Sequence, residues 1–203
     1  MSVRVILFDV MDTLLADPFR EALRAATEVP LDEVFARRAP DLWPAFERGE
    51  ITEDEYWSGW DAAGVPFDAD AFHRVRRANT NWLPGMPQLL DALEGVVHRV
   101  AASNYPVWIE EVSTVHLTGR LDRVLASHHL GVRKPDAAFY ERLLDAADIA
   151  PHEALFVDDR DVNVEAAERL GIASHRFVDA GSLTAWLRGH DIAVAHDRHD
   201  GAR

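Results

Sequence analysis

The segment of residues 3–8 constrains the fold more strongly than any other part of the sequence. It is a short, mostly apolar run with several β-branched residues, and this pattern predicts a buried strand. Asp9 ends the run, and Thr13 follows four residues later. A carboxylate at the mouth of a buried strand is a candidate nucleophile, so the segment predicts both a strand and a site.

The second half of the chain alternates between strand-like and helical segments. Such alternation predicts a parallel sheet that helices cover on both faces. Residues 17–80 have helical patterns without strands, and Thr52-Glu53-Asp54-Glu55 among them fits a capping box. The predicted strands are residues 3–8, 96–102, 123–127, 154–157 and 172–177, and the predicted helices of the second half are residues 88–93, 107–117, 136–147, 162–170 and 182–187.

These patterns predict the fold class and the domain organisation. We expect an α/β protein with a doubly wound parallel sheet of Rossmann-like type, formed by residues 1–15 and 83–189. The all-helical stretch, residues 16–82, is then a helical cap inserted after the first strand. Residues 190–203 are polar and lack clear periodicity, which predicts a loose tail.

Composition and charge exclude several classes of function. The net charge of −14 argues against nucleic acid or an anionic membrane as a partner, because both need a basic face. The chain has no cysteine, which excludes disulfides and thiolate sites. No apolar run reaches the roughly 18 residues of a membrane span, and no signal peptide is visible before the first strand. We therefore expect a cytoplasmic protein, a monomer or homodimer, without nucleic-acid or membrane partners.

Polar side chains follow several of the predicted strands or their connections. Ligands of open parallel sheets bind at the carboxyl ends of the strands, so these side chains are expected to converge on one site. Any one of them alone is typical of a turn or a helix cap, and it is their combination and order that indicates a site. The groups are Asp9, Ser103-Asn104, Lys134 and the pair Asp158-Asp159.

Four motifs in this order make the chain resemble the haloacid dehalogenase superfamily of hydrolases, in the subclass with a helical cap between the first and second motifs. The resemblance covers residues 3 to about 178 and specifies the fold and the site more than the substrate. The motifs are Phe8-Asp9-Val10-Met11-Asp12-Thr13-Leu14, then Ala102-Ser103-Asn104, then Lys134-Pro135, and finally Phe156-Val157-Asp158-Asp159 with the residues up to Ala167.

The resemblance implies a Mg²⁺-dependent phosphohydrolase that acts on a small phosphorylated molecule. Asp9 would attack the substrate and form an aspartyl intermediate, while Thr13 and Ser103 would hold phosphate oxygens. Mg²⁺ prefers oxygen ligands and commonly uses one or two carboxylates together with phosphate and water. The implied catalytic residues are Asp9, Thr13, Ser103, Asn104 and Lys134, and the implied metal ligands are Asp9, the backbone carbonyl of Met11, Asp158 and Asp159.

Lys134 has separate support from composition, because it is the only lysine of the chain and the other 20 basic residues are arginines. The planar fork of arginine cannot replace a compact ammonium group in a tight site. With Lys134 in the site, no lysine remains in the cap to form a Schiff base. This disfavours the phosphonate-cleaving branch of the superfamily, which relies on one.

Met11 departs from the pattern of the superfamily, which usually has a second aspartate there to protonate the leaving group. General acid assistance is worth roughly 10²–10⁴-fold, and a thioether supplies none. One hypothesis is a phosphohydrolase that takes its proton from Asp12, a cap residue or water, or that has a good leaving group. Another is a 2-haloacid dehalogenase, since a halide leaves without a proton. The third is a phosphate-ligand-binding protein with little or no catalysis.

The fourth motif helps to choose among these hypotheses. Dehalogenases of the superfamily work without a metal and tend to lack a carboxylate pair at this place. The pair Asp158-Asp159 therefore favours Mg²⁺ and a phosphorylated ligand.

Aromatic residues are concentrated in the predicted cap. One interpretation is a small helical core, and the other is a surface that stacks a planar substrate such as a flavin or a nucleotide. The residues are Phe35, Trp43, Phe46, Tyr56, Trp57, Trp60, Phe67, Phe72 and Trp82.

Overall fold

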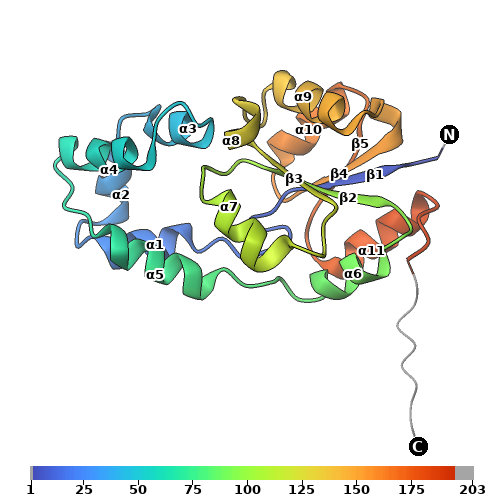
Figure 1. The fold of residues 1–203 in the computed structure, drawn as a ribbon, viewed down its shortest axis with the longest axis horizontal. Coiled ribbons are helices and arrows are strands. Elements are labelled where there is room, and N and C mark those ends of the chain that lie inside the picture. Colours follow the sequence, from blue (N-terminus) through green and yellow to red (C-terminus); the bar gives the residue numbers. More distant parts are fainter. Residues whose placement is uncertain (1, 195–203) are drawn as a thin grey trace, which may run out of the picture.

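The computed structural model describes residues 2–194 of the chain. A β-sheet lies between layers of helices (Figure 1). Within these residues the strands form one sheet of five, in the order β3-β2-β1-β4-β5, and every pairing is parallel. The first strand is therefore central, as its fully buried sequence requires. The strands are β1 (Val5–Phe8), β2 (His98–Ser103), β3 (Arg123–Ala126), β4 (Ala154–Asp158) and β5 (Ala173–Arg176).

Helices cover both faces of the sheet, which explains why β1 is apolar on both sides (Figure 1). Ile6 and Phe8 pack on one face, whereas Val5 and Leu7 pack on the other. The first face carries α6 (Met86–Ala92), α7 (Ile109–Val112) with the π-helix Ser113–Leu117, and α11 (Ala180–Gly189). The second carries α9 (Ala137–Ala147) and α10 (Asp161–Arg169), while α8 (Ser127–Leu130) follows β3 and the 3-10 helix Pro151–Glu153 precedes β4.

A helical insertion separates β1 from β2 in the sequence and lies to one side of the sheet (Figure 1). Its buried side chains, such as Phe46 and Trp60, belong to the same apolar cluster as Ile6 and Phe8. The capping box predicted at Thr52 is present and begins α4, because Thr52 and Glu55 bond each other's backbone amides. The helices of the insertion are α1 (Phe19–Ala26), α2 (Leu31–Arg37), α3 (Leu42–Glu47), α4 (Glu53–Ala62) and α5 (Ala69–Asn79).

The predicted fold class is confirmed, and the differences are local. The third strand ends at Ala126, because Ser127 begins α8, a one-turn helix that no periodic pattern could have indicated. Ile192 and Val194 are buried against the core, so residues 190–194 are not part of a loose tail. The rest of the predicted tail, 195–203, lies outside the described residues. No helix within residues 2–194 combines the length and the apolarity needed to cross a bilayer.

Candidate active site

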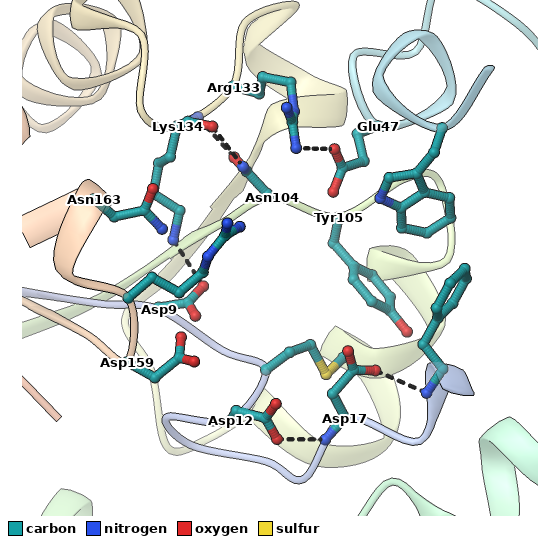
Figure 2. Close-up of a pocket in the computed structure, with 14 residues that line it drawn as sticks. Asp9, Asp12, Asp17, Glu47, Asn104, Tyr105, Arg133, Lys134, Asp159 and Asn163 are labelled. Atoms are coloured by element: carbon teal, nitrogen blue, oxygen red, sulfur yellow. Dashed lines mark hydrogen bonds and ion pairs between the residues drawn. The ribbon is translucent and has the colours of Figure 1, made fainter. Parts of the chain in front are cut away.

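The carboxyl ends of β1, β2 and β4 meet below a cavity of about 290 Å³. The strand register brings the acids together: Phe8 lies opposite Val157, and the Asp9 amide donates to the Val157 carbonyl at 2.8 Å. Asp9 therefore lies beside Asp158, although 149 positions separate them in the sequence. The cavity is lined by Asp9, Met11, Asp12, Asp17, Phe19, Trp43, Glu47, Asn104, Tyr105, Arg133, Lys134, Asp159, Arg160 and Asn163 (Figure 2).

Lys134 forms a buried ion-pair network with Asp9 and Asp158. These three residues are called the floor of the cavity below. Its Nζ atom lies 2.8 Å from Asp9 Oδ1 and 2.7 Å from Asp158 Oδ2, and the lysine is only 2% exposed. Asn104 fixes the lysine backbone, because its side chain accepts from the Lys134 amide and donates to the Lys134 carbonyl. A charge removed from water in this way is stable only with its partners, so the three charged groups depend on one another.

Burial and the neighbouring charges shift the pKa values of Asp9 and Lys134. Loss of water raises the pKa of Asp9 to about 7, against the opposing charge of Lys134 and with a further rise from Asp158. Burial by itself would lower the pKa of Lys134, but the attraction of Asp158 and Asp9 outweighs it and raises that pKa. The lysine is therefore held as an ammonium ion against the candidate nucleophile.

Asp158 and Asp159, adjacent in the sequence, have different surroundings. Both oxygens of Asp158 are bonded: Asn163 Nδ2 reaches each of them, the Arg160 amide donates to Oδ1, and the carboxylate is fully buried. Asp159 instead lines the cavity and is half-buried (Figure 2). Burial raises the pKa of Asp159, and the neighbouring charge of Asp158 adds to the rise. Asp158 thus orients Lys134, whereas Asp159 presents its carboxylate to the cavity.

The donor set of the cavity fits a hard divalent cation. Asp9, Asp158 and Asp159 each offer an oxygen, and the three oxygens lie within 4.8 Å of one another. Oxygen ligands of this kind suit Mg²⁺. Three carboxylates face the single ammonium of Lys134, so a divalent cation would offset the remaining repulsion.

Two buried hydroxyl groups, one in the connection after β1 and one at the end of β2, have no hydrogen-bond partner within residues 2–194. They are Thr13 Oγ1 and Ser103 Oγ, on side chains that are 0% and 1% exposed. Buried polar groups in folded proteins are nearly always bonded, so hydroxyls of this kind are suited to a ligand. Their residues are those that the motifs assign to phosphate oxygens.

Met11 and Asp12 lie in the tight connection after β1. Met11 lines the cavity and bridges to Leu15, while Asp12 adopts a left-handed backbone with φ of 59°. Asp12 Oδ1 accepts from the Asp17 amide at 3.0 Å, so this carboxylate holds the chain as it enters α1. Such a short polar side chain tolerates the left-handed conformation.

The wall of the cavity opposite Asp9 is formed by Phe19, Trp43 and Glu47 of the helical insertion together with Tyr105. The sequence motifs did not predict it. The ring centroids of Phe19 and Trp43 are 4.6 Å apart, and Trp43 also packs against Trp108. Glu47 from α3 forms a 2.7 Å ion pair with Arg133, the neighbour of Lys134 (Figure 2). Loss of water raises the pKa of Glu47, which Arg133 opposes. This wall therefore joins the insertion to the core across the cavity.

Most of the aromatic residues singled out in the sequence form the core of the insertion instead. Phe46 stacks on Tyr56 at 4.6 Å, and Trp57 stacks on Phe67 at 4.7 Å. Of the nine, Trp43 is the one that lines the described cavity. The first interpretation, a small helical core, therefore holds for most of the set, and a substrate-stacking surface stays a prediction that involves Trp43 alone of the nine.

The chain is similar to known proteins over most of its length. Residues 3–171 match the haloacid dehalogenase-like hydrolases. Flavin mononucleotide hydrolase 1 from Arabidopsis thaliana, named as chloroplastic, is 32% identical over 193 residues, which span 94% of this chain and 79% of the relative. The sesquiterpene phosphatase astK from Aspergillus oryzae is 32% identical over 80% of this chain and 85% of its own.

The fold is also similar to that of solved enzymes. A HAD family enzyme from Bacteroides thetaiotaomicron, solved with magnesium and inorganic phosphate, superposes with a TM-score of 0.75 at 16% identity. The match covers 88% of this chain and 96% of that one.

Proposed function

The chain belongs to the haloacid dehalogenase-like hydrolases, and on that premise we propose that it is a Mg²⁺-dependent phosphohydrolase of a small phosphorylated metabolite. One observation carries the proposal: Lys134 pairs with Asp9 at 2.8 Å beside a carboxylate, Asp159, that faces the same cavity. This arrangement combines a candidate nucleophile, a fixed positive charge and a cation site. These are the groups that transfer of a phosphoryl group to a carboxylate needs.

The chemistry proposed for Asp9 is nucleophilic substitution at phosphorus. A carboxylate oxygen attacks, the alcohol leaves, and water then hydrolyses the aspartyl phosphate. Lys134 bonds Asp9 Oδ1 and so fixes the direction in which the carboxylate faces the substrate. The unpartnered hydroxyls of Thr13 and Ser103 donate to the phosphate oxygens.

Mg²⁺ would be held by Asp9, the backbone carbonyl of Met11 and Asp159, and it would offset the negative charge of the phosphate. Asp158, also predicted as a metal ligand, belongs to the same cluster of oxygens, but its four short contacts favour a role in holding Lys134 in place. The structural relative that was solved with magnesium and phosphate supports this cofactor.

The wall of the cavity suggests the kind of alcohol that leaves. Phe19, Trp43 and Tyr105 offer apolar and aromatic surface, which favours an organic part with a ring or a long apolar group. We propose that residues 16–82 cap the site and select for it. Flavin mononucleotide is the first substrate to test, because a relative that is 32% identical over 94% of this chain carries that activity in its name. The absence of cysteine is compatible with a cytoplasmic location.

The experiment compares phosphate esters of graded leaving-group acidity, p-nitrophenyl phosphate and flavin mononucleotide among them, with Mg²⁺ and with a chelator. We expect release of phosphate that requires Mg²⁺. Saturable binding of phosphate esters without turnover would instead identify a binding protein, as the thioether of Met11 allows. Halide release from 2-chloropropionate without metal would identify a dehalogenase. Either result would contradict the proposal.

A further inference from the structure

We propose that Asp17 is the general acid that protonates the leaving alcohol, the task that Met11 cannot perform. This inference rests on the proposed phosphohydrolase function and extends it to the residue that completes the reaction. It starts from the cavity itself, where Asp17 and Met11 are both lining residues. Asp17 lies in the connection between β1 and α1, eight positions after the candidate nucleophile.

The backbone around Asp17 fixes its carboxylate at the cavity. Its amide donates to Asp12 Oδ1 at 3.0 Å, and its own Oδ1 accepts from the Phe19 amide at 2.9 Å. Figure 2 shows the carboxylate between Asp12 and Tyr105, with its other oxygen directed into the cavity. Phe19, the residue that holds Oδ1, belongs to the wall proposed for the leaving group. The free oxygen of Asp17 is therefore on the side from which the alcohol departs.

The other carboxyl groups that line the cavity already have a task. Asp9 is the candidate nucleophile, and Asp159 is a candidate metal ligand. Glu47 is held by an ion pair with Arg133 at 2.7 Å, so its carboxylate is engaged on the far side of the cavity. Asp12 accepts from the backbone and positions Asp17. Asp17 is the remaining carboxyl group of this set.

The electrostatics of Asp17 are compatible with an acid role. The side chain opens to solvent through the cavity, but the surrounding protein removes enough water to raise the pKa of Asp17 to about 6. The bond from the Phe19 amide opposes this rise, and the charges of Asp12 and Asp159 add to it. A general acid works best when its pKa lies near the operating pH.

The proposed step balances in protons and bonds. The carboxyl proton of Asp17 moves to the ester oxygen as the bond from that oxygen to phosphorus breaks and the bond from Asp9 to phosphorus forms. The alcohol leaves neutral, and Asp17 remains as a carboxylate. Asp17 then takes a proton from the water that attacks the aspartyl phosphate, which releases inorganic phosphate and restores Asp9.

The test compares two esters in the Asp17→Asn variant. Flavin mononucleotide expels a primary alkoxide and needs the proton, whereas p-nitrophenyl phosphate expels a stable anion and needs it far less. We expect kcat on flavin mononucleotide to fall by about 10²-fold or more, and kcat on the nitrophenyl ester to fall by a much smaller factor. The matched control is Asp61→Asn, an exposed aspartate of α4 that does not line the cavity.

A second variant separates an acid role from a structural one. Met11→Asp should raise turnover of flavin mononucleotide by a clearly larger factor in the Asp17→Asn background than in the wild type, because only the former lacks an acid. Equal losses on both esters, or an equal gain from Met11→Asp in both backgrounds, would overturn the role of Asp17. If the wild type hydrolyses neither ester with Mg²⁺, the phosphohydrolase proposal itself fails, which is a different result.

Discussion

The floor and the wall of the cavity are built on different physical principles. The floor is made of charges at the strand ends, where Lys134, Asp9 and Asp158 are nearly inaccessible to water and bonded to one another. The wall is made of side chains from the insertion, where Phe19 and Trp43 make tilted ring contacts. A buried charge left without its partner is costly, whereas a lost ring contact reduces affinity in small steps. In the proposed reaction, the floor therefore supplies the nucleophile and its ammonium partner, whereas the wall contacts the leaving group.

Asp9→Asn should have the largest effect, because it removes the attacking oxygen without changing the size of the side chain. We expect kcat/KM on p-nitrophenyl phosphate to fall by about 10³-fold or more. Steady-state kinetics measures the loss, and circular dichroism checks that the variant is folded. Activity equal to that of the wild type would show that the floor does not provide the nucleophile.

Lys134→Met should unfold more easily, because it leaves two buried carboxylates without their cation. Breaking a buried pair costs about 3–5 kcal/mol of unfolding free energy. Urea unfolding at neutral pH measures the change, and Lys134→Arg is the matched control that keeps the charge but not the shape. An unfolding midpoint like that of the wild type would mean that the floor is not held together by its charges.

Asp159→Asn should weaken the response to metal while leaving the buried network intact. We expect the Mg²⁺ concentration for half-maximal activity to rise by more than about 10-fold. Asn163→Ala is the comparison, because it removes donors from Asp158 and should act on stability instead. A Mg²⁺ requirement unchanged in Asp159→Asn would remove this residue from the metal site.

Trp43→Ala should have the smallest effect and should test the wall alone. We expect KM for flavin mononucleotide to rise by about 10-fold with kcat nearly unchanged, since a lost apolar contact is worth roughly 1–3 kcal/mol. A small ester such as phosphoglycolate is the control, and its KM should change little. A fall in kcat on both esters would show that Trp43 contributes to the chemical step and not only to binding.

Sequence reasoning identified the floor because its residues follow strands. Asp9 and Asp158 occupy strand ends that a parallel sheet must bring together, and the sole lysine indicated the cation between them. The same reasoning could not separate Asp158 from Asp159. The surroundings of the two carboxylates differ because Asn163 and the Arg160 amide bond Asp158, and these contacts form only in the folded loop.

The motifs did not predict most of the wall, because its contacts also depend on how the folded chain packs. Asp17 precedes a helix and its side chain bonds the Phe19 amide, as is common at helix starts, yet the same residue also faces the cavity. Arg133 stands next to Lys134 in the sequence but pairs with Glu47, a contact across 86 positions that no local pattern encodes. The aromatic composition of the insertion fitted both a core and a binding surface, and packing alone assigns each ring.

The most direct test of the central claim is to trap the enzyme during turnover and locate the phosphoryl group. Wild-type protein is mixed with p-nitrophenyl phosphate and Mg²⁺, quenched in acid within milliseconds, digested, and analysed by mass spectrometry. The account predicts that the peptide containing Asp9 gains the mass of one phosphoryl group, and that Asp9→Asn gains none. Turnover by the wild type with that peptide unmodified, or with the group on another residue, would contradict it.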